Sequence, residues 1–421
     1  MDKFINKRLL WIGCLESDNE FKLKCEKGYN LASAQVSQNN IVTGIKEILG
    51  QSIDTINGSI VPHYPVYKDK IIETVEWNSE EDSYNISVGY KNIKYINRLT
   101  CKNAMKKAAT NWVNDRYNNE ELVVIVYSMR STAMATACQI KKMIPSAKLY
   151  LIVTDLPEYM DLGASKLKLF LKKIDWISIK KNQKLFDGFI LYAEKMSEYL
   201  NIPDNKWLLM EGLYDGNELI NKKENFLKNK KIIMYSGKLE KEYGIDMLLN
   251  AFMKIQGSEY ELWLTGGGNS EEYIKECVKK DSRIKFYGFL PSRKDVLEMQ
   301  EQASILLNMR LPSEKASKYC FPSKLFEYMV TGIPVVSFKI EGIPKEYYKY
   351  ITFVENETEE SLVKTLKDLL EKKETERLEM GRQARQFILS NKNKLVQCNK
   401  IINFIINDDK ELNYEKNIMG M

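Results

Sequence analysis

Basic side chains and glycines recur at the ends of apolar runs in the second half of the chain, where they suit the binding of a diphosphate. The most informative segment reads YCFPSKLFEYMVTGIPVVSF, at residues 319–338. Pro322 and Ser323 are residues that begin helices, Ser323 as a natural N-cap. The free N–H groups of such a helix favour a phosphate, and Lys324 adds a full charge. Glu327, one turn further on, can accept hydrogen bonds from ribose hydroxyls. An ordinary helix start with a surface glutamate is the alternative.

Other strand ends in the same half carry similar residues, namely Gly237, Lys238, Lys241, Gly266, Gly267 and Arg310. Gly237 permits a close backbone approach, and Lys238 and Lys241 can meet anionic oxygens. The planar guanidinium of Arg310 suits a two-pronged grip on a pyrophosphate. Solvated charged loops and a plain glycine turn are the alternatives. Four anion-capable strand ends in one half of the chain favour a shared site.

The composition disfavours metal-dependent and nucleic-acid-directed roles. A single histidine, His63, excludes His-pair metal sites, and no Asp-x-Asp pair follows a strand. The formal net charge of +6 over 421 residues is too mild for a dedicated nucleic-acid binder. Seven scattered cysteines without a C-x-x-C pair indicate reduced thiols in the cytosol. We therefore expect no metal, no cofactor and no nucleic-acid partner.

The elements that position these residues alternate along the chain. Short runs that are apolar on both faces predict buried parallel strands at 8–13, 122–127, 149–154, 188–192, 231–236, 261–265, 305–308 and 334–338. Amphipathic stretches predict helices between many of them, for example at 131–143, 244–255, 271–279 and 294–302. The pattern predicts an α/β fold with two Rossmann-like domains that face a cleft, each a parallel sheet flanked by helices. We expect a first domain at 1–215, a second domain at 216–390, a linker near 212–228, and a helical tail at 391–421.

The order and spacing of five motifs resemble the C-terminal half of retaining GT-B glycosyltransferases, specifically glycosyltransferase family 4 in its capsular and exopolysaccharide branch. The motifs are SGKLEKEYGIDMLLNAF, LTGGG, FYGFLP, NMRLP and FPSKLFEYMVTGIPVV, within residues 230–370. The resemblance implies that Lys238 contacts the donor diphosphate, that Glu327 binds the donor ribose, and that Phe289 lies where backbone groups meet the base. It also implies that residues 1–215 form the acceptor-binding domain, that residues 216–390 form the nucleotide-sugar-binding domain, and that the tail at 391–421 crosses back to the first domain. Two positions depart from the family pattern. Tyr319 replaces the usual first glutamate, and Tyr243 replaces the usual lysine before Gly244.

The expected nucleotide-sugar site therefore comprises Gly237, Lys238, Lys241, Gly266, Gly267, Phe289, Arg310, Phe321, Pro322, Ser323, Lys324 and Glu327. Asp155 and Lys238 are the expected catalytic residues, because Asp155 lies where many relatives carry a histidine that faces the reacting sugar. A loop carboxylate that caps the next turn is the alternative for Asp155. Residues 33–40 occur where relatives have a glycine-rich acceptor loop, and Gln38 and Asn39 are the expected acceptor contacts.

These inferences predict a retaining, hexosyltransferase-type glycosyltransferase that moves a sugar from a nucleotide diphosphate-sugar to a hydroxyl of a glycan or lipid-linked acceptor. Cell-surface polysaccharide or glycolipid synthesis is the expected setting. The cations and the helix end would stabilise the charge of the departing diphosphate, so that no metal is needed. Two alternatives stay open at this point. One is a nucleotide-sugar epimerase on a GT-B-like fold, and the other is a non-catalytic partner in a glycan assembly complex.

Residues 165–184 carry seven lysines against one aspartate. Five apolar residues share one stripe of the expected helix, namely Leu167, Phe170, Leu171, Ile174 and Ile177. Such a helix can lie on an anionic bilayer surface. The alternative is an amphipathic helix that packs its stripe on the core. We expect a cytoplasmic protein with peripheral attachment at the inner face of the plasma membrane.

Overall fold

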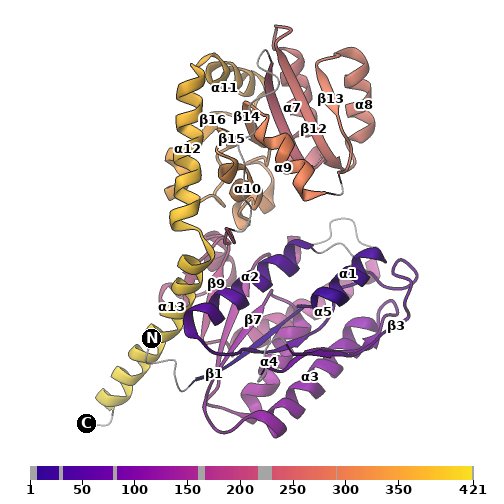
Figure 1. The fold of residues 1–421 in the computed structure, drawn as a ribbon. Helices are drawn as coiled ribbons and strands as arrows, with labels where there is room; N and C mark the ends of the chain where they lie inside the picture. Colours follow the sequence, from indigo (N-terminus) through magenta and orange to yellow (C-terminus); the bar gives the residue numbers. More distant parts are fainter. Residues whose placement is uncertain are drawn as a thin grey trace. The chain divides into compact units, whose positions relative to one another are not determined.

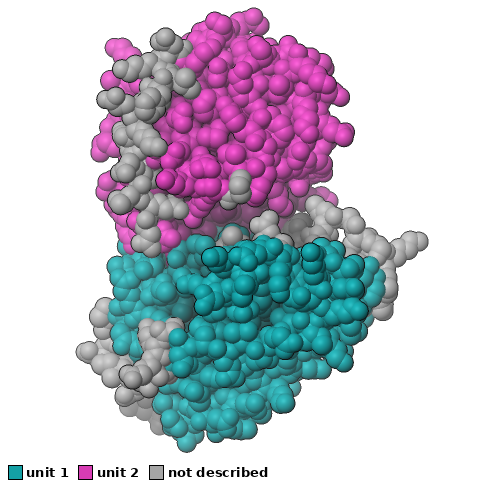
Figure 2. Space-filling view, turned by 45° about the vertical axis from the view of Figure 1, so that its right-hand side comes forward, with its two compact units in different colours: residues 1–192, 196–210, 394–421 teal, residues 193–195, 211–393 magenta. Residues whose placement is uncertain are grey.

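The chain forms two compact units in a computed structural model, which describes residues 7–27, 32–78, 83–159, 166–216, 230–290 and 292–419. Unit 1 comprises residues 1–192, 196–210 and 394–421, and unit 2 comprises residues 193–195 and 211–393 (Figure 2). Each unit is a sheet with helices on its faces (Figure 1). Most of the predicted linker, from residue 217 to residue 228, lies outside the described residues.

The sheet of unit 2 is parallel throughout. Its strands are β11 (Lys231–Lys238), β12 (Tyr260–Gly267), β13 (Ile284–Phe286), β14 (Ile305–Asn308), β15 (Val335–Phe338) and β16 (Ile351–Val354). They lie in the order β13-β12-β11-β14-β15-β16. Numbered along the chain this is 3-2-1-4-5-6, the order of a doubly wound dinucleotide-binding sheet. The direction of winding reverses between β11 and β14, which are hydrogen-bonded neighbours.

Alternate residues of β11 face opposite layers of helices. Ile233 and Tyr235 pack in a core with α7 (Ile245–Met253), α8 (Glu271–Lys280) and α11 (Glu359–Glu371). Ile232 and Met234 pack in a second core with α10 (Lys324–Thr331) and α12 (Glu374–Asn391), next to Met299 of α9 (Arg293–Glu301). Because both faces are covered, the strand is apolar on both faces from Ile232 to Tyr235. The expected α/β fold with parallel sheets flanked by helices is therefore confirmed.

Unit 1 contains an eight-stranded sheet in the order β10-β9-β8-β7-β1-β2-β5-β4. The strands are β1 (Lys7–Gly13), β2 (Asp54–Asn57), β4 (Val75–Trp77), β5 (Asn85–Ser87), β7 (Glu121–Tyr127), β8 (Lys148–Val153), β9 (Gly188–Leu191) and β10 (Trp207–Leu209). All neighbours are parallel except β4 and β5. A separate antiparallel pair joins β3 (Ile71–Ile72) to β6 (Tyr90–Lys91).

The helices of unit 1 are α1 (Asp18–Glu26), α2 (Ala32–Leu49), α3 (Asn97–Arg116), α4 (Ser131–Met143), α5 (Lys166–Gln183), α6 (Lys195–Leu200) and α13 (Lys394–Met419). Helices α3, α4 and α5 pack side by side, and α2 packs against α13. Residues 33–40, which occur where relatives have a glycine-rich acceptor loop, make up the first turns of α2. The stretch contains no glycine or proline that would interrupt a helix.

Candidate functional site

The carboxyl ends of the strands of unit 2 gather residues that the sequence singles out. Gly237 and Lys238 end β11, and Arg310 lies two residues beyond the end of β14. These neighbouring strands mark the reversal of strand order, where doubly wound sheets bind ligands. Gly266 and Gly267 end β12, on the other side of β11. The fold thus brings these five residues to one edge of one sheet.

Gly266 allows the paired ends of β11 and β12 to approach closely. Its φ is +134°, and a Cβ at this position would lie 1.7 Å from the carbonyl oxygen of Gly237. A Cβ at Gly267 would meet only the side chain of Glu271, at 3.2 Å. The N–H of Leu239 then donates to the carbonyl of Gly267 at 3.0 Å. Close packing of the ends of β11 and β12 therefore requires glycine at position 266 but not at position 267.

Helix α10 begins beside the end of β11. Ser323 occupies the N-cap position, but its φ of −54° and ψ of −25° are already helical, and its side chain makes no capping hydrogen bond. The expected side-chain cap is therefore wrong, since capping hydroxyls usually reach the helix from extended backbone. Lys324 lies close to the strand end, because its Cε is 3.7 Å from the position that a Cβ of Gly237 would take. The helix start and the end of β11 border the same space.

A buried glutamine orients Glu327. Gln300, in the last turn of α9, is fully buried, and its Nε2 donates to Glu327 Oε1 at 2.6 Å and to Ser236 Oγ at 2.9 Å. Lys324 Nζ approaches the same Glu327 oxygen at 3.3 Å. One neutral donor and one cation thus fix a carboxylate whose side chain is only 17% exposed. Its second oxygen lies 3.5 Å from Lys324 Nζ.

Tyr328 ties α10 to the end of β11. Its hydroxyl accepts a hydrogen bond from the N–H of Ser236 at 3.1 Å and donates to the carbonyl of the same residue at 2.9 Å. Burial raises the pKa of Tyr328, so the phenol keeps its proton and can donate. Sequence reasoning missed Gln300, Ser236 and Tyr328. The available signal was a serine inside an otherwise apolar strand.

Arg310 presents a guanidinium that is supported by an aromatic ring. The guanidinium carbon lies 5.3 Å from the centroid of Tyr243, within the range of a cation–π contact. Its Nε is buried and has no hydrogen-bond partner among the described residues. Tyr243, which departs from the family pattern, therefore holds a neighbouring cation. Lys241 is exposed and lies 3.8 Å from Asp246.

The predicted aromatic contacts divide into one exposed ring and one buried ring. Phe289 is 72% exposed, and the preceding Gly288 carbonyl accepts hydrogen bonds from Gly266 N and Thr265 Oγ1, both at 2.8 Å. That exposed ring can contact a ligand. Phe321 is buried instead, 5.0 Å from the ring of Phe326 and 5.2 Å from that of Tyr347. Phe321 and the buried Pro322 support α10 from the core.

The predicted residues of unit 1 occupy different environments. Asp155 is exposed, two residues beyond the end of β8. Gln38 is fully buried, and its Oε1 accepts a hydrogen bond from the N–H of Cys14 at 2.9 Å. Its side chain therefore positions the loop after β1. Asn39 is exposed on α2, so of the two predicted acceptor contacts it is the accessible one.

A buried charged network that sequence reasoning missed lies after β1 and β2. Lys24 Nζ lies 2.6 Å from Glu16 Oε2 and donates to Ser59 Oγ at 2.8 Å. Ser59 in turn bonds Glu16 and lies 3.1 Å from Ser87 Oγ. Both ionic side chains are at least nine-tenths buried. The network fixes the loops at the carboxyl edge of the sheet of unit 1.

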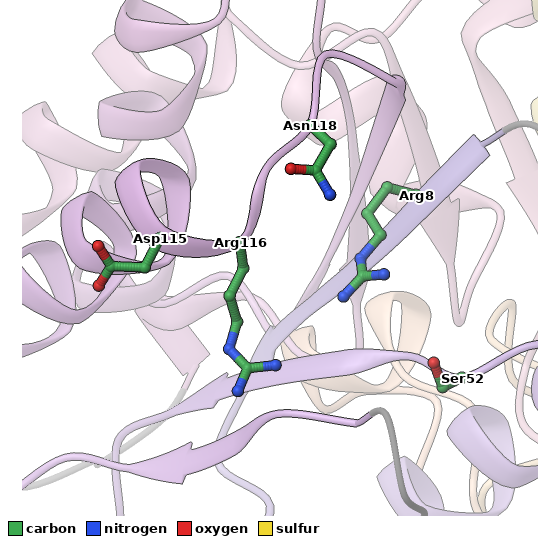
Figure 3. Close-up of a pocket in the computed structure, with 5 residues that line it drawn as sticks. All are labelled: Arg8, Ser52, Asp115, Arg116 and Asn118. Atoms are coloured by element: carbon green, nitrogen blue, oxygen red, sulfur yellow. The ribbon is translucent and has the colours of Figure 1, made fainter.

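A shallow pocket of about 700 Å³ in unit 1 contains none of the predicted site residues. It is lined by Arg8, Ser52, Asp115, Arg116 and Asn118. The guanidinium groups of Arg8 and Arg116 point into the same space, while Asp115 points away (Figure 3). Arg8 is paired with the buried Asp54 at 2.6 Å. It lies on β1 near the amino ends of the strands, opposite the edge where such sheets bind ligands.

Three further observations concern metal sites, membrane-spanning helices and cysteines. Within the described ranges, no three His, Cys, Asp or Glu side chains gather as a metal site would require. Metal independence stays a prediction. No helix in the described part of the chain has the length and apolar character needed to cross a bilayer. All seven cysteines, which fall in described ranges, are free.

Comparison with known proteins identifies what unit 2 is similar to. Residues 216–387 match the model of glycosyl transferases group 1. A stretch of 118 residues is 27% identical to the amylovoran biosynthesis glycosyltransferase AmsK of Erwinia amylovora. That stretch covers 27% of this chain and 29% of AmsK. The sequence similarity is thus confined to part of each protein.

Solved structures are similar over nearly the whole chain. Sucrose-phosphate synthase from Thermosynechococcus elongatus has a TM-score of 0.66 at 12% identity, with 95% of this chain and 98% of that chain covered. Anabaena Alr3699/HepE in complex with UDP has a TM-score of 0.61 at 11% identity, with 95% and 100% covered. At these identities the likeness shows the fold alone. The comparisons therefore show that residues 216–387 are similar to glycosyl transferases group 1 and that the chain shares the two-domain fold of these solved structures.

Proposed function

We propose that the protein is a retaining glycosyltransferase of the family 4 type, which transfers a hexose from a nucleotide diphosphate-sugar to an acceptor hydroxyl. Unit 2 binds the donor, and unit 1 binds a glycan or lipid-linked acceptor. The observation that carries the proposal is the gathering of Lys238, Arg310, Lys324 and Glu327 around the strand-order reversal of unit 2. The match of residues 216–387 to glycosyl transferases group 1 supports it.

The cations of this edge act on the leaving diphosphate. As the bond from the sugar to the diphosphate breaks, negative charge builds on the phosphate oxygens, which Lys238, Arg310, Lys241 and the N–H groups at the start of α10 stabilise. One positioned donor of this kind contributes about 3 kcal/mol to lowering the barrier. Lys324 is partly engaged with Glu327, at 3.3 Å. It therefore links the diphosphate to the carboxylate that accepts the ribose hydroxyls.

Retention of the anomeric configuration of the sugar is inferred from the family resemblance. The acceptor proton passes to an oxygen of the donor's own phosphate, so that attack and departure occur on one face of the sugar. Asp155 orients the acceptor or the sugar and does not attack. No metal is required in this scheme, because the cationic side chains supply the charge.

The setting proposed for this reaction is synthesis of cell-surface polysaccharide in the cytoplasm, at the inner face of the plasma membrane. AmsK, named for amylovoran biosynthesis, supports a polysaccharide product. The lysine-rich helix α5 supports membrane attachment, since Ile174 and Ile177 of the predicted stripe are exposed and do not pack on the core.

The test is a transfer assay with UDP-sugars and GDP-sugars, in which NMR assigns the anomeric configuration of the product. Lys238→Ala and Glu327→Ala are each expected to lower kcat/KM by roughly 100-fold, with little change in melting temperature. Lys275→Ala, which alters an exposed lysine of α8, is the control and should leave transfer unchanged. Unaltered kinetics in both site variants would remove the proposed site. Isomerisation of the donor without an acceptor would favour an epimerase, and an inverted product would exclude retention.

A further inference from the structure

Unit 1 carries an unusual concentration of exposed apolar side chains outside the proposed site. Of the seventeen large apolar residues that are exposed in the described part of the chain, nine come from residues 64–99 and from α5. They are Tyr64, Val66, Ile71, Ile93, Tyr95, Ile96, Leu99, Ile174 and Ile177, and they are called the apolar face below. Val66 is 70% exposed and Ile177 is 69% exposed. Scattered single exposures need no explanation, whereas a contiguous patch marks an interaction site.

Backbone pairing makes the first part of the apolar face continuous. Tyr64 forms an isolated bridge with Ile93, and β3 pairs with β6 so that Ile71 stands opposite Lys91. The N–H of Asn92 donates to the carbonyl of Lys70 at 2.7 Å. Residues 64–72 and residues 90–93 are therefore held side by side by backbone hydrogen bonds.

The start of α3 connects this part to α5. Arg98 Nη1 lies 3.3 Å from Asp175 Oδ2, which brings the first turn of α3 next to α5. Leu99 and Ile174 neighbour the two members of this ion pair in sequence, and both are at least half exposed. The exposed residues of the two helices thus extend one surface.

Tyr95 exposes its ring to solvent from a strained backbone conformation. Its φ is +72°, in the left-handed region that bulky residues avoid, and its side chain is 51% exposed. A glycine or asparagine would adopt this turn more easily. A backbone that exposes an aromatic ring at a conformational cost favours a role of this ring in binding.

Basic side chains surround the apolar face. Lys68, Lys70, Lys91 and Lys94 are exposed, and none of them forms an ion pair with another described residue. Lys70 lies 4.9 Å from the ring centroid of Tyr64, and Lys94 lies 5.1 Å from that of Tyr95. The acidic Asp69 and Asp175 are engaged by Lys27 and Arg98. Aliphatic residues, tyrosines and lysines in this arrangement match the boundary between lipid headgroups and acyl chains.

We propose that the apolar face is the membrane-docking surface of the protein and seats on an anionic bilayer. Val66, Ile71, Ile96, Leu99, Ile174 and Ile177 enter the acyl boundary, while the four lysines meet anionic headgroups. The proposal deepens the membrane part of the proposed function, because it places docking on residues 64–99 as well as on α5. It does not depend on glycosyl transfer.

Cosedimentation of the full chain with vesicles tests the proposal. Vesicles of phosphatidylcholine alone and of phosphatidylcholine with phosphatidylglycerol in equal parts are compared at low and high salt. We expect binding to the anionic vesicles that weakens with salt. Val66→Asp/Ile96→Asp and, separately, Lys91→Glu/Lys94→Glu should each lower the partition coefficient at least about tenfold. Leu378→Asp, which alters a 41% exposed leucine of α12 in unit 2, is the matched control and should bind as the parent does.

Several outcomes overturn the proposal. These are the absence of vesicle binding by the parent chain, equal binding to both vesicle types, and parent-like binding of the Val66/Ile96 variant. A parent protein that self-associates through this face without binding vesicles would instead assign the face to a second copy. Melting temperature and thermal shift with UDP and GDP are measured for every variant. If a variant still binds UDP or GDP but no longer binds vesicles, the docking surface is distinct from the donor site. If the parent chain binds neither UDP nor GDP, that result counts against the proposed function and not against the docking surface.

Discussion

At the scale of single residues, the proposed donor site depends on a buried side chain, Gln300, which is not among the residues proposed to contact the donor. Gln300 gives both hydrogen atoms of its amide nitrogen to buried acceptors, Ser236 Oγ and Glu327 Oε1. Its own Oε1 is buried without a partner among the described residues. An unmet acceptor is costly in a dry environment, so this glutamine is a positioning residue whose amide orients the carboxylate of Glu327.

Gln300→Leu should weaken donor binding more than it weakens the fold. The leucine removes the 2.6 Å donor to Glu327 but also removes the unmet Oε1, so the free energy of unfolding should change by only about 1 kcal/mol. We expect the Kd for the nucleotide-sugar to rise roughly tenfold, since a hydrogen bond to a charged group is worth about 1.5–3 kcal/mol. Titration calorimetry measures the Kd, and urea unfolding measures the free energy of unfolding.

Gln300→Glu is the matched variant. It keeps the size of the side chain but places a second carboxylate against Glu327, and like charges at this distance oppose ionisation. It should therefore destabilise the fold by about 3 kcal/mol or more and abolish donor binding. Parent-like donor affinity in Gln300→Leu would show that Glu327 needs no such support.

Sequence reasoning singled out the charged residues of the proposed site but not the side chains that support them. Lys238, Arg310, Lys324 and Glu327 stand out because charged residues at strand ends break an apolar pattern. Gln300 does not, because nothing in a polar residue near the end of a helix reveals that tertiary packing will bury it completely. Ser323 begins α10 as expected, yet only the backbone conformation shows that its hydroxyl makes no cap.

At the scale of elements, the two adjacent glycines that end β12 differ in importance. Gly266→Ala would drive a methyl group to 1.7 Å from the Gly237 carbonyl oxygen at a φ of +134°, so the paired strand ends must separate. We expect a loss of about 3 kcal/mol in the free energy of unfolding, together with loss of donor binding. Gly267→Ala meets one side-chain oxygen at 3.2 Å and should cost less than about 1 kcal/mol. Equal effects of the two substitutions in urea unfolding would contradict this account.

The packing of α13 on α2 makes unit 1 sensitive to alkali. Cys398 of α13 is fully buried beside Gly44, and burial raises its pKa from 9.0 to about 12. Because the folded-state pKa is the higher one, the stability that this thiol contributes is intact below pH 9 and is lost as the pH rises toward 12. Cys398→Ala should therefore be less stable than the parent at pH 8, and the difference should narrow at pH 10 to 11. Urea unfolding across this range measures it, and a constant difference would show that the thiol does not titrate.

Strands that are apolar on both faces were predictable, whereas the polar strand β2 and the three-residue strands β5 and β13 were not. Strands β1, β7, β8, β11 and β14 are recognisable as runs that are apolar on both faces, because helices cover both sides of the sheet. Strands β5 and β13 have three residues each, too few to show a period. Strand β2 reads Asp-Thr-Ile-Asn, and its polar residues are buried because partners such as Arg8 and Asn85 satisfy them.

At the scale of the whole molecule, the chain enters unit 2 after residue 210 and returns to unit 1 after residue 393, apart from the short stretch 193–195 that also belongs to unit 2. A buried ion pair within unit 2 joins the residues next to these two crossings. Lys392 and Glu211 are each 1% exposed and are bonded to one another, and Lys392 also lies 2.6 Å from Glu346. The ring of Tyr347 lies 5.1 Å from Lys392 Nζ and its hydroxyl donates to Glu211. Burial and the charge of Glu211 raise the pKa of Tyr347.

Lys392→Met should cost about 3–5 kcal/mol in the stability of unit 2, because it leaves the Glu211 carboxylate buried without its cation. The double variant Lys392→Met/Glu211→Leu removes both charges and should recover a large part of that loss. A double-mutant cycle in urea measures the coupling. Additive losses would mean that the pair contributes no mutual stabilisation.

The placement of α13 has a consequence for the order in which the protein matures. Unit 1 is discontinuous in sequence, and the helix that covers Ile41 and Gly44 of α2 begins only at residue 394. A nascent chain must therefore complete all of unit 2 on the ribosome before the first unit can close its own core. Until then the apolar side of α2 is exposed to solvent. Translation arrested before residue 394 would leave an aggregation-prone intermediate that chaperones would have to bind.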